Sequence, residues 1–204
     1  MRQASMVLDE KSVKKNPFDQ FDLWFKDALK LDLKDPNAMN IATSTKSGKP
    51  SSRMVLLKDY SKKGFVFFTN YNGRKGKEII ANPHVALNIY WEPYERQVRI
   101  EGTAKKLSTA ASNKYFASRP RLSQLGAHAS NQSEVIENYE VLLDKIEYFK
   151  KKFKGKSIPR PKHWGGFCVT PATIEFWQGH KGRLHDRLKF SKNKNTWKFV
   201  RLSP

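Results

Sequence analysis

The feature that most constrains the fold of this chain is a long series of short apolar runs separated by turn-forming residues. Runs rich in β-branched and aromatic residues, bounded by Gly, Pro, Asn or Ser, are typical of β-strands. Strands are expected at 39–45, 52–58, 64–70, 85–91, 97–107, 166–170, 173–178, 187–191 and 196–202. Because they follow one another without regular helical crossovers, the pattern favours a mainly β fold with flanking helices (α+β). A small antiparallel barrel fits this pattern better than a doubly wound parallel sheet.

Four helices are expected outside this barrel, because apolar residues recur at helical spacing between the strands. They are predicted at 18–30, 74–81, 108–118 and 133–153. Asn16 and Pro17 supply a cap and a first-turn residue for the first helix. Ser108 and Ser133 are the expected caps of the last two helices.

The length of 204 residues fits one domain with a sizeable core. We expect residues 1–16 to be a flexible N-terminal segment and residues 17–204 to be a single domain with peripheral helices. No apolar run approaches the roughly 20 residues needed to span a bilayer, and residues 1–15 lack the apolar core of a secretory signal. Cys168 is the one cysteine, which excludes an intramolecular disulfide framework. A cytoplasmic protein is expected.

The charge of the chain is strongly positive, with 39 Lys and Arg against 19 Asp and Glu and a net charge of +20. Such a field attracts polyanions and also small phosphorylated metabolites. A nucleic-acid-binding protein is therefore one interpretation, supported by Tyr90, Trp91 and Tyr94 beside basic residues. Lysine runs that simply form solvated faces are the alternative explanation of the charge.

The stretch from Arg183 to Arg187 is the densest group of candidate functional residues. If it is extended, Arg183, His185 and Arg187 point to one face, because side chains alternate along a strand. Guanidinium groups offer forked donors and stack on flat rings, so this face would suit an anionic, planar ligand. A solvated basic strand is the alternative.

Two cationic groups near the middle of the chain are candidate phosphate contacts. The segment 72–75 follows a strand and opens a helix, where free amides and the helix dipole attract an anion; a basic turn is the alternative. Arg53 and Lys58 lie five residues apart, so on one regular strand they would point to opposite faces and serve different groups. For Arg53, a buried salt bridge is the alternative.

Tyr115, Arg119 and Ser123 form a third candidate phosphate site. Tyr115 and Arg119 are four residues apart and share a helix face, and Ser123 follows just after Pro120. A phenol, a guanidinium and a hydroxyl could close round one phosphate. A cluster of hydrogen bonds at a helix end is the alternative.

The sequence offers little nucleophilic or metal-binding machinery of its own. The five histidines lack metal-ligand spacing and no cysteine cluster joins them, so no metal is expected. There is neither a glycine-rich dinucleotide fingerprint nor a Walker loop. An enzyme with this sequence would therefore depend on a bound cofactor for the chemistry.

Nine motifs, in this order, together resemble the pyridoxine/pyridoxamine 5′-phosphate oxidase family from about Pro17 to the last residues, 201–204. They are RMVLLK (53–58), FFTN (67–70), RK (74–75), ERQV (95–98), YFASRP (115–120), SNQS (130–133), WGGF (164–167), FWQG (176–179) and RLHDR (183–187). In one departure, Gly73 stands where serine is common in the family.

The resemblance implies a split β-barrel that binds flavin mononucleotide (FMN) at the subunit interface of a homodimer. The implied reaction oxidises pyridoxine 5′-phosphate or pyridoxamine 5′-phosphate to pyridoxal 5′-phosphate in vitamin B6 biosynthesis or salvage. O2 is the implied electron acceptor, with release of H2O2, and of NH3 from the amine. Neither a membrane nor a nucleic-acid partner is then expected.

The resemblance also implies a role for individual residues. The implied cofactor contacts are Arg53, Met54, Val55, Leu56, Leu57, Lys58, Phe68, Thr69, Arg74, Lys75, Gln97, Gln132, Ser133, Trp177 and Arg187. The implied substrate contacts are Lys58, Tyr115, Arg119, Ser123, Arg183, Leu184 and His185. Arg183 and His185 are the implied catalytic residues. A related FMN-binding split-barrel flavin reductase, or another flavoprotein, is the alternative, although the presence of Tyr115, Arg119 and Ser123 favours the oxidase.

Overall fold

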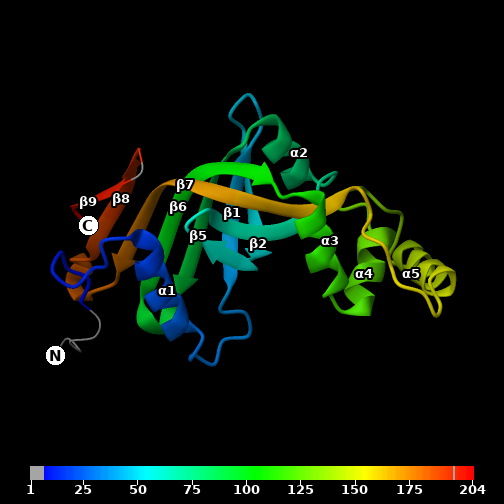
Figure 1. Cartoon of the computed structure of the whole chain (residues 1–204), viewed down its shortest axis with the longest axis horizontal. Coiled ribbons are helices and arrows are strands. Elements are labelled where there is room, and N and C mark those ends of the chain that lie inside the picture. The colour runs from blue at the N-terminus through cyan, green and yellow to red at the C-terminus, as the bar shows by residue number, and fades with distance from the viewer. Residues whose placement is uncertain (1–6, 195) are drawn as a thin grey trace.

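A computed structural model describes residues 7–194 and 196–204 of the chain. In this part of the chain, nine strands form one curled antiparallel sheet with helices around it (Figure 1). The strand order is β2-β1-β5-β6-β7-β4-β3, and β8 adds to β7 while β9 adds to β8. The expected mainly β fold with flanking helices is therefore confirmed. No helix of the described residues is long and apolar enough to span a bilayer.

The elements lie close to the expected positions. The strands are β1 (Ala38–Ser44), β2 (Pro50–Leu56), β3 (Asp59–Ser61), β4 (Gly64–Asn70), β5 (His84–Trp91), β6 (Arg96–Lys106), β7 (Trp164–Gln178), β8 (Asp186–Asn193) and β9 (Thr196–Arg201). The α-helices are α1 (Pro17–Ala28), α2 (Arg74–Ala81), α3 (Thr109–Ala117), α4 (Arg121–Ala129) and α5 (Glu140–Lys152). Within the described residues, 3-10 turns lie at Glu92–Tyr94 and Lys181–Arg183.

The main core lies between α1 and the curled sheet. Asn16 caps α1 by accepting a hydrogen bond from the Phe18 amide at 3.0 Å. Along α1, Phe21, Trp24 and Ala28 are buried, and Phe21 packs edge-on against Phe65 of β4 with ring centroids 4.9 Å apart. The alternating burial along β5 shows that the sheet has one core face and one outer face.

The strand β7 holds the two halves of the sheet together, and it is continuous where two strands were expected. One edge pairs with β6 from Phe167 to Gln178; the other pairs with β4 from Trp164 to Val169 and with β8 from Thr173 to Gln178. Pro171 lies between these two pairings and beside a register shift in β6. A proline has no amide to donate, so it fits at this interruption: neither β4 nor β8 pairs with Pro171, and the register with β6 shifts beside it. The sheet splits at this point.

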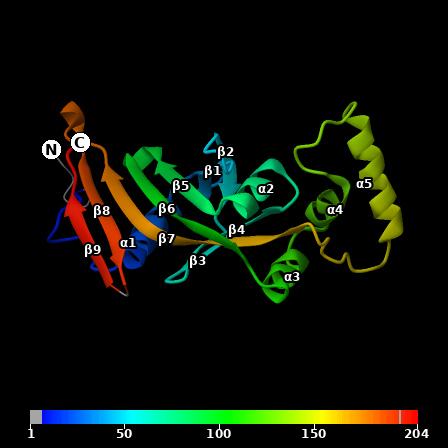
Figure 2. The same ribbon diagram turned by 90° about the horizontal axis from the view of Figure 1, so that it is seen from above.

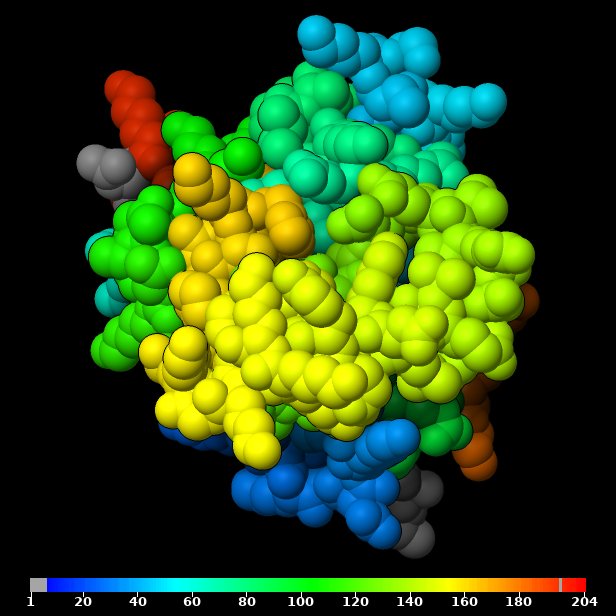
Figure 3. Space-filling model, turned by 90° about the vertical axis from the view of Figure 1, so that its right-hand side faces the viewer, coloured from blue at the N-terminus to red at the C-terminus, as the bar shows by residue number. Residues whose placement is uncertain are grey.

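The helices α3, α4 and α5 form a separate end of the molecule, far from β8 and β9 (Figures 1 and 2). Phe116, Leu125, Ile158 and Trp164 form a second small core there. Figure 3 shows α5 and the segment after it covering this end. Ser108 caps α3 as expected, since its hydroxyl accepts from the Ala111 amide.

The helix expected at 133–153 begins later, and α4 and β3 were not anticipated. Ser133 is not a helix cap: its φ is 74°, and its hydroxyl accepts from the amide of Arg74, 3.3 Å away. Ser133 therefore contacts the start of α2, and α5 begins only at Glu140.

Part of the segment expected to be flexible packs on the domain. Residues 1–6 lie outside the described residues, but Leu8 and Val13 are buried in the main core. Glu10 forms an ion pair with Arg201 near the end of the chain, with Nε and Oε1 2.6 Å apart.

Candidate active site

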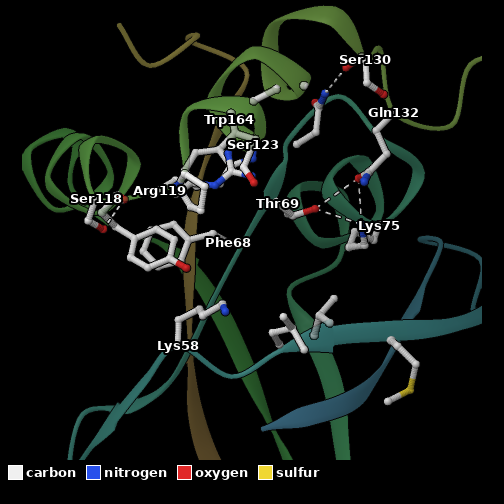
Figure 4. A pocket seen from close by; sticks show the side chains of 18 residues that line it. Lys58, Phe68, Thr69, Lys75, Ser118, Arg119, Ser123, Ser130, Gln132 and Trp164 are labelled. Atoms are coloured by element: carbon white, nitrogen blue, oxygen red, sulfur yellow. Dashed lines mark hydrogen bonds between the residues drawn. The ribbon is translucent and has the colours of Figure 1, made fainter. Parts of the chain in front are cut away.

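A cavity of about 670 Å³ lies where β2, β4, α2, α3 and α4 meet. It is lined by Met54, Val55, Leu56, Lys58, Phe68, Thr69, Asn70, Lys75, Tyr115, Ser118, Arg119, Pro120, Ser123, Gly126, Ala127, Ser130, Gln132 and Trp164. Three cations, Lys58, Lys75 and Arg119, lie around the same hollow, and none of the lining residues is acidic (Figure 4). Such a cavity suits an anionic ligand of the size that enzymes commonly bind.

Lys75 lies at the α2 side of the cavity. Its ammonium group donates to the Thr69 hydroxyl at 2.9 Å and to the Gln132 side-chain oxygen at 2.8 Å (Figure 4). Burial, and then the nearby charge of Arg53, lower the pKa of Lys75 to about 8. Burial has removed water from the charged Lys75 side chain, and a negatively charged ligand bound beside it would stabilise that charge again.

Aromatic rings hold the Tyr115–Arg119 side of the cavity. The Tyr115 ring stacks on Phe68 with centroids 3.8 Å apart, and the Arg119 guanidinium lies over Trp164 at 4.4 Å from the ring centroid. Among the described residues, Nη1 of Arg119 is the one buried side-chain polar atom without a hydrogen-bond partner. Burial lowers the pKa of Arg119 and raises that of the Tyr115 phenol. A buried donor without a partner points to a ligand, because leaving it unpaired is costly.

Tyr115, Arg119 and Ser123 all line this cavity, so the structure brings the three expected residues together. Their role as a phosphate site stays a prediction. Trp164 was not assigned a role from the sequence, although it belongs to one of the nine motifs. The sequence shows no signal for its position, because Trp164 opens a strand that lies 45 residues beyond Arg119 in the chain.

Arg53 lies beside the cavity and takes part in the salt bridge considered as its alternative role. Its Nη2 lies 3.6 Å from Oε2 of Glu78, and its guanidinium donates to the hydroxyls of Thr43 and Ser51 at 2.5 and 2.6 Å. Lys58 comes after the end of β2, so the expectation that it shares one regular strand with Arg53 is wrong.

Other expected cofactor contacts lie near the cavity without lining it. Leu57 is buried in the main core. Arg74 and Ser133 line a neighbouring hollow of about 260 Å³, on the other side of Gln132. A Cβ at Gly73 would lie 2.8 Å from Oε1 of Gln132, so glycine leaves room for that side chain.

The remaining expected residues form a second cluster, at the other end of β7. Gln97, Trp177 and Arg187 lie side by side on neighbouring strands, as the strand register shows. The Trp177 ring contacts His185 with centroids 4.6 Å apart. His185 Nδ1 accepts from the His180 amide at 3.2 Å, which places the ring proton of the neutral imidazole on Nε2.

The expectation that 183–187 is extended is wrong in its first part. Lys181–Arg183 is a 3-10 turn, Arg183 has φ 62°, and β8 begins only at Asp186. Two positive-φ residues, Gly182 and Arg183, turn the chain before it enters the sheet. Arg183 and Leu184 are consequently exposed.

The two clusters are far apart within one chain. Trp164 begins β7 at the cavity and Trp177 lies near its other end, 13 residues later. At about 3.3 Å per residue, this corresponds to roughly 40 Å of strand. Figure 1 shows the start of β8 far from α3 and α4, so Arg183 and His185, just before β8, do not reach Tyr115 and Arg119 of their own chain. Among the described residues, no cluster of His, Cys, Asp and Glu is arranged to hold a metal ion.

Comparison with known proteins identifies the family. Residues 25–153 match the family model described as pyridoxamine 5′-phosphate oxidase. Residues 164–204 match the model described as pyridoxine 5′-phosphate oxidase C-terminal dimerisation region. The chain belongs to the pyridoxine/pyridoxamine 5′-phosphate oxidase family. It is an enzyme of that family, and the family resemblance of its nine motifs is confirmed.

Individual relatives agree over nearly the whole chain. The pyridoxine/pyridoxamine 5′-phosphate oxidase of Trichormus variabilis is 54% identical over 199 residues, which cover 97% of this chain and 93% of that protein. The protein of the same name from Haemophilus influenzae is 51% identical over 198 residues, covering 97% and 94%.

Two solved structures confirm the split-barrel fold. PhzG from Burkholderia lata, in complex with tetrahydrophenazine-1-carboxylic acid, has a TM-score of 0.90 and 28% identity, covering 97% of this chain and 98% of that one. A pyridoxamine 5′-phosphate oxidase-related, FMN-binding protein from Nostoc punctiforme has a TM-score of 0.73 and 13% identity. It covers 98% of this chain and all of that one, and it supports the fold alone.

Proposed function

We propose that this enzyme binds FMN and oxidises pyridoxine 5′-phosphate or pyridoxamine 5′-phosphate to pyridoxal 5′-phosphate. O2 is the electron acceptor: the alcohol yields H2O2, and the amine, with one water molecule, yields H2O2 and NH3. The observation that carries the proposal is the cavity with three cations, no acidic lining residue and an unpartnered buried nitrogen on Arg119. The names of relatives that are 50–56% identical support the same substrates.

The residues present fit FMN. Arg53, Arg74 and Lys75 surround the start of α2 and would hold the 5′-phosphate, since guanidinium and ammonium groups are strong phosphate donors. Met54–Leu56, Phe68 and Thr69 give the cavity an apolar wall for a flat ring system. Bound FMN would supply the acceptor for a hydride from the exocyclic carbon of the substrate and the route of two electrons to O2.

The substrate phosphate would bind at the Tyr115 side of the cavity. Lys58, Tyr115, Arg119 and Ser123 would donate hydrogen bonds to it, and the Arg119–Trp164 contact would fix the guanidinium in place. Holding the phosphate would orient the rest of the substrate, and positioning is a major part of catalysis when the cofactor supplies the reactive group.

The second cluster would complete the site from another copy of the chain. Gln97, Trp177 and Arg187 would contact the cofactor, and Arg183 and His185 would lie over the substrate ring. The match of residues 164–204 to a dimerisation region supports this arrangement, as does the length of β7 between the clusters. Arg183 would orient the carbon that bears the alcohol or amine for hydride transfer.

Anaerobic reduction of the bound cofactor tests this function. Purified protein is loaded with FMN, freed of oxygen and mixed with pyridoxine 5′-phosphate or pyridoxamine 5′-phosphate while the visible absorbance of the flavin is followed. Bleaching that reverses on admission of air is the expected result. If the flavin binds but neither substrate bleaches it, the proposed cofactor stands and the proposed substrates are wrong. A flavin reductase or another flavoprotein activity would then be the remaining explanation.

A further inference from the structure

Glu78 is a buried carboxylate in the middle of the cationic group at α2. It lies one helical turn after Arg74, and its side chain is 7% exposed. Its Oε1 accepts from Nε of Arg74 at 2.9 Å. Its Oε2 accepts from the hydroxyls of Ser51, at 2.6 Å, and Thr43. Burial would raise the pKa of Glu78, but these hydrogen bonds and the Arg74 charge outweigh it and lower the pKa to about 2.

The two hydroxyls connect Glu78 to Arg53. Nη1 of Arg53 donates to Thr43 and Nη2 donates to Ser51. A hydroxyl has one proton, so a hydroxyl that donates to Glu78 can only accept from Arg53. The ionised carboxylate therefore sets the direction of both hydroxyls and, through them, the orientation of the Arg53 guanidinium.

This group of side chains keeps an excess of positive charge that a phosphate could neutralise. Arg53, Arg74 and Lys75 carry three positive charges and Glu78 carries one negative charge, which leaves a formal excess of two. A phosphate monoester carries a charge of about −2 near neutral pH. Glu78 thus holds two arginines in place without cancelling the charge that attracts the ligand.

We propose that Glu78 is the positioning residue of the flavin phosphate site. It aims Arg53 through Thr43 and Ser51 and holds Arg74 directly, so that both guanidinium groups are oriented before the cofactor binds. This inference rests on the proposed function, because it takes FMN to be the ligand of the cationic group. Glu78 itself makes no contact with the cofactor in this role.

The test compares FMN with riboflavin, which has the same ring system without the phosphate. Binding of each flavin to the apoprotein is measured by fluorescence quenching, for the unchanged protein and for Glu78→Gln. The amide keeps the shape of the side chain but cannot accept from both hydroxyls and Arg74 at once. We expect the ratio of FMN affinity to riboflavin affinity to fall about tenfold or more, while riboflavin affinity changes by less than about twofold.

Two further variants separate positioning from charge and from folding. Glu134→Gln removes an exposed carboxylate from the hollow beside Arg74, so it controls for the change in charge. In this variant the ratio of FMN affinity to riboflavin affinity should stay unchanged. Ser51→Ala interrupts one path between Glu78 and Arg53 with a minimal change, and should lower the ratio even if Glu78→Gln folds poorly.

The other outcomes overturn the inference in distinguishable ways. A higher FMN affinity in Glu78→Gln would show that the carboxylate only repels the phosphate. Equal losses for FMN and riboflavin would show a merely structural role. If the unchanged protein binds FMN no better than riboflavin, the phosphate site itself is rejected, and the proposed cofactor with it.

Discussion

The guanidinium carbon of Arg119 lies 4.4 Å from the centroid of the Trp164 ring, and this contact joins the connection between α3 and α4 to the start of β7. Trp164 is 7% exposed and also packs edge-on against Phe116. The indole face thus packs against the Arg119 guanidinium. Nη1 of this guanidinium has no hydrogen-bond partner in the protein. A cation over an indole face is stabilised by about 0.5–2 kcal/mol, depending on its exposure.

Replacing Trp164 should therefore weaken binding of the substrate phosphate. We expect Trp164→Leu to raise the KM for pyridoxine 5′-phosphate roughly fivefold to thirtyfold, the equivalent of about 1–2 kcal/mol. The kcat and the affinity for FMN should change much less. Trp164→Phe keeps an aromatic face and should have a smaller effect in the same steady-state assay. An unchanged KM in Trp164→Leu would contradict a role of this ring in holding Arg119.

Arg119 and Trp164 also show what the sequence could and could not predict. Arg119 was predicted because Tyr115 lies one helical turn before it, and such short-range spacing is visible in a sequence. Trp164 reaches Arg119 only through the pairing of β7 with β4, where Trp164 lies opposite Asn70. A contact created by strand pairing depends on the tertiary fold, so spacing alone does not reveal it.

The errors have the same origin. Apolar spacing from Ile136 to Phe153 predicted one long helix, but Ser133 binds the start of α2, and α5 begins only at Glu140. Two strands were expected at 166–170 and 173–178, yet β7 is continuous and its neighbour on one edge changes from β4 to β8 between these ranges. In both places, contacts with segments distant in the sequence overrode the local sequence pattern.

The pKa of Lys75 predicts how FMN binding depends on pH. Burial and the Arg53 charge lower this pKa to about 8, so the unliganded ammonium group loses its proton between about pH 7 and pH 9. The FMN phosphate stays doubly charged in this window, since its second pKa is about 6. The affinity for FMN should therefore fall up to about tenfold as pH rises from about 7 to about 9.

Riboflavin and a matched variant control that pH experiment. Riboflavin has no phosphate, so its affinity should change little over the same range. Lys75→Arg keeps its charge at these pH values and should remove most of the pH dependence, even if its absolute affinity is lower. A parallel decline for FMN and riboflavin would place the titrating group elsewhere.

Two glycines in the left-handed half of backbone space should differ strongly in their tolerance of alanine. At Gly48, with φ 83°, a Cβ would meet no atom within 4 Å. Gly48→Ala should therefore lower the free energy of unfolding only by the cost of a left-handed backbone, about 1–2 kcal/mol. At Gly64, with φ 141°, a Cβ would lie 2.2 Å from the Val169 carbonyl oxygen. Because that atom is backbone, Gly64→Ala should lower the free energy of unfolding by more than about 3 kcal/mol. Urea unfolding of both apoproteins tests this, and equal losses would refute the close approach of β4 and β7.

Arg183 should matter for the reaction rather than for binding of the cofactor. It is exposed in its own chain, at the turn before β8, and we propose that it orients the reacting carbon of the substrate for hydride transfer. We expect Arg183→Leu to slow anaerobic reduction of the bound flavin about a hundredfold or more, while the FMN affinity changes by only a few fold. Lys181→Leu, a neighbour in the same turn, is the matched control. Similar losses of reduction rate and FMN affinity in Arg183→Leu would remove this role.

The distance between the two clusters predicts that each active site is shared between two copies of the chain. Arg119 lies at the α3 end of the molecule and Arg183 beyond the far end of β7, so one chain cannot bring them together (Figure 1). If a dimer pairs each cavity with the second cluster of the other copy, heterodimers of defective chains regain one intact site. Differently tagged chains that carry Arg119→Ala and Arg183→Leu, co-expressed and purified as the heterodimer, should have about half the activity of the unchanged dimer. A heterodimer of an unchanged chain with one that carries both substitutions should be nearly inactive, because each of its two sites contains one of them. Sites built within single chains would give the reverse, with activity in the second heterodimer and almost none in the first.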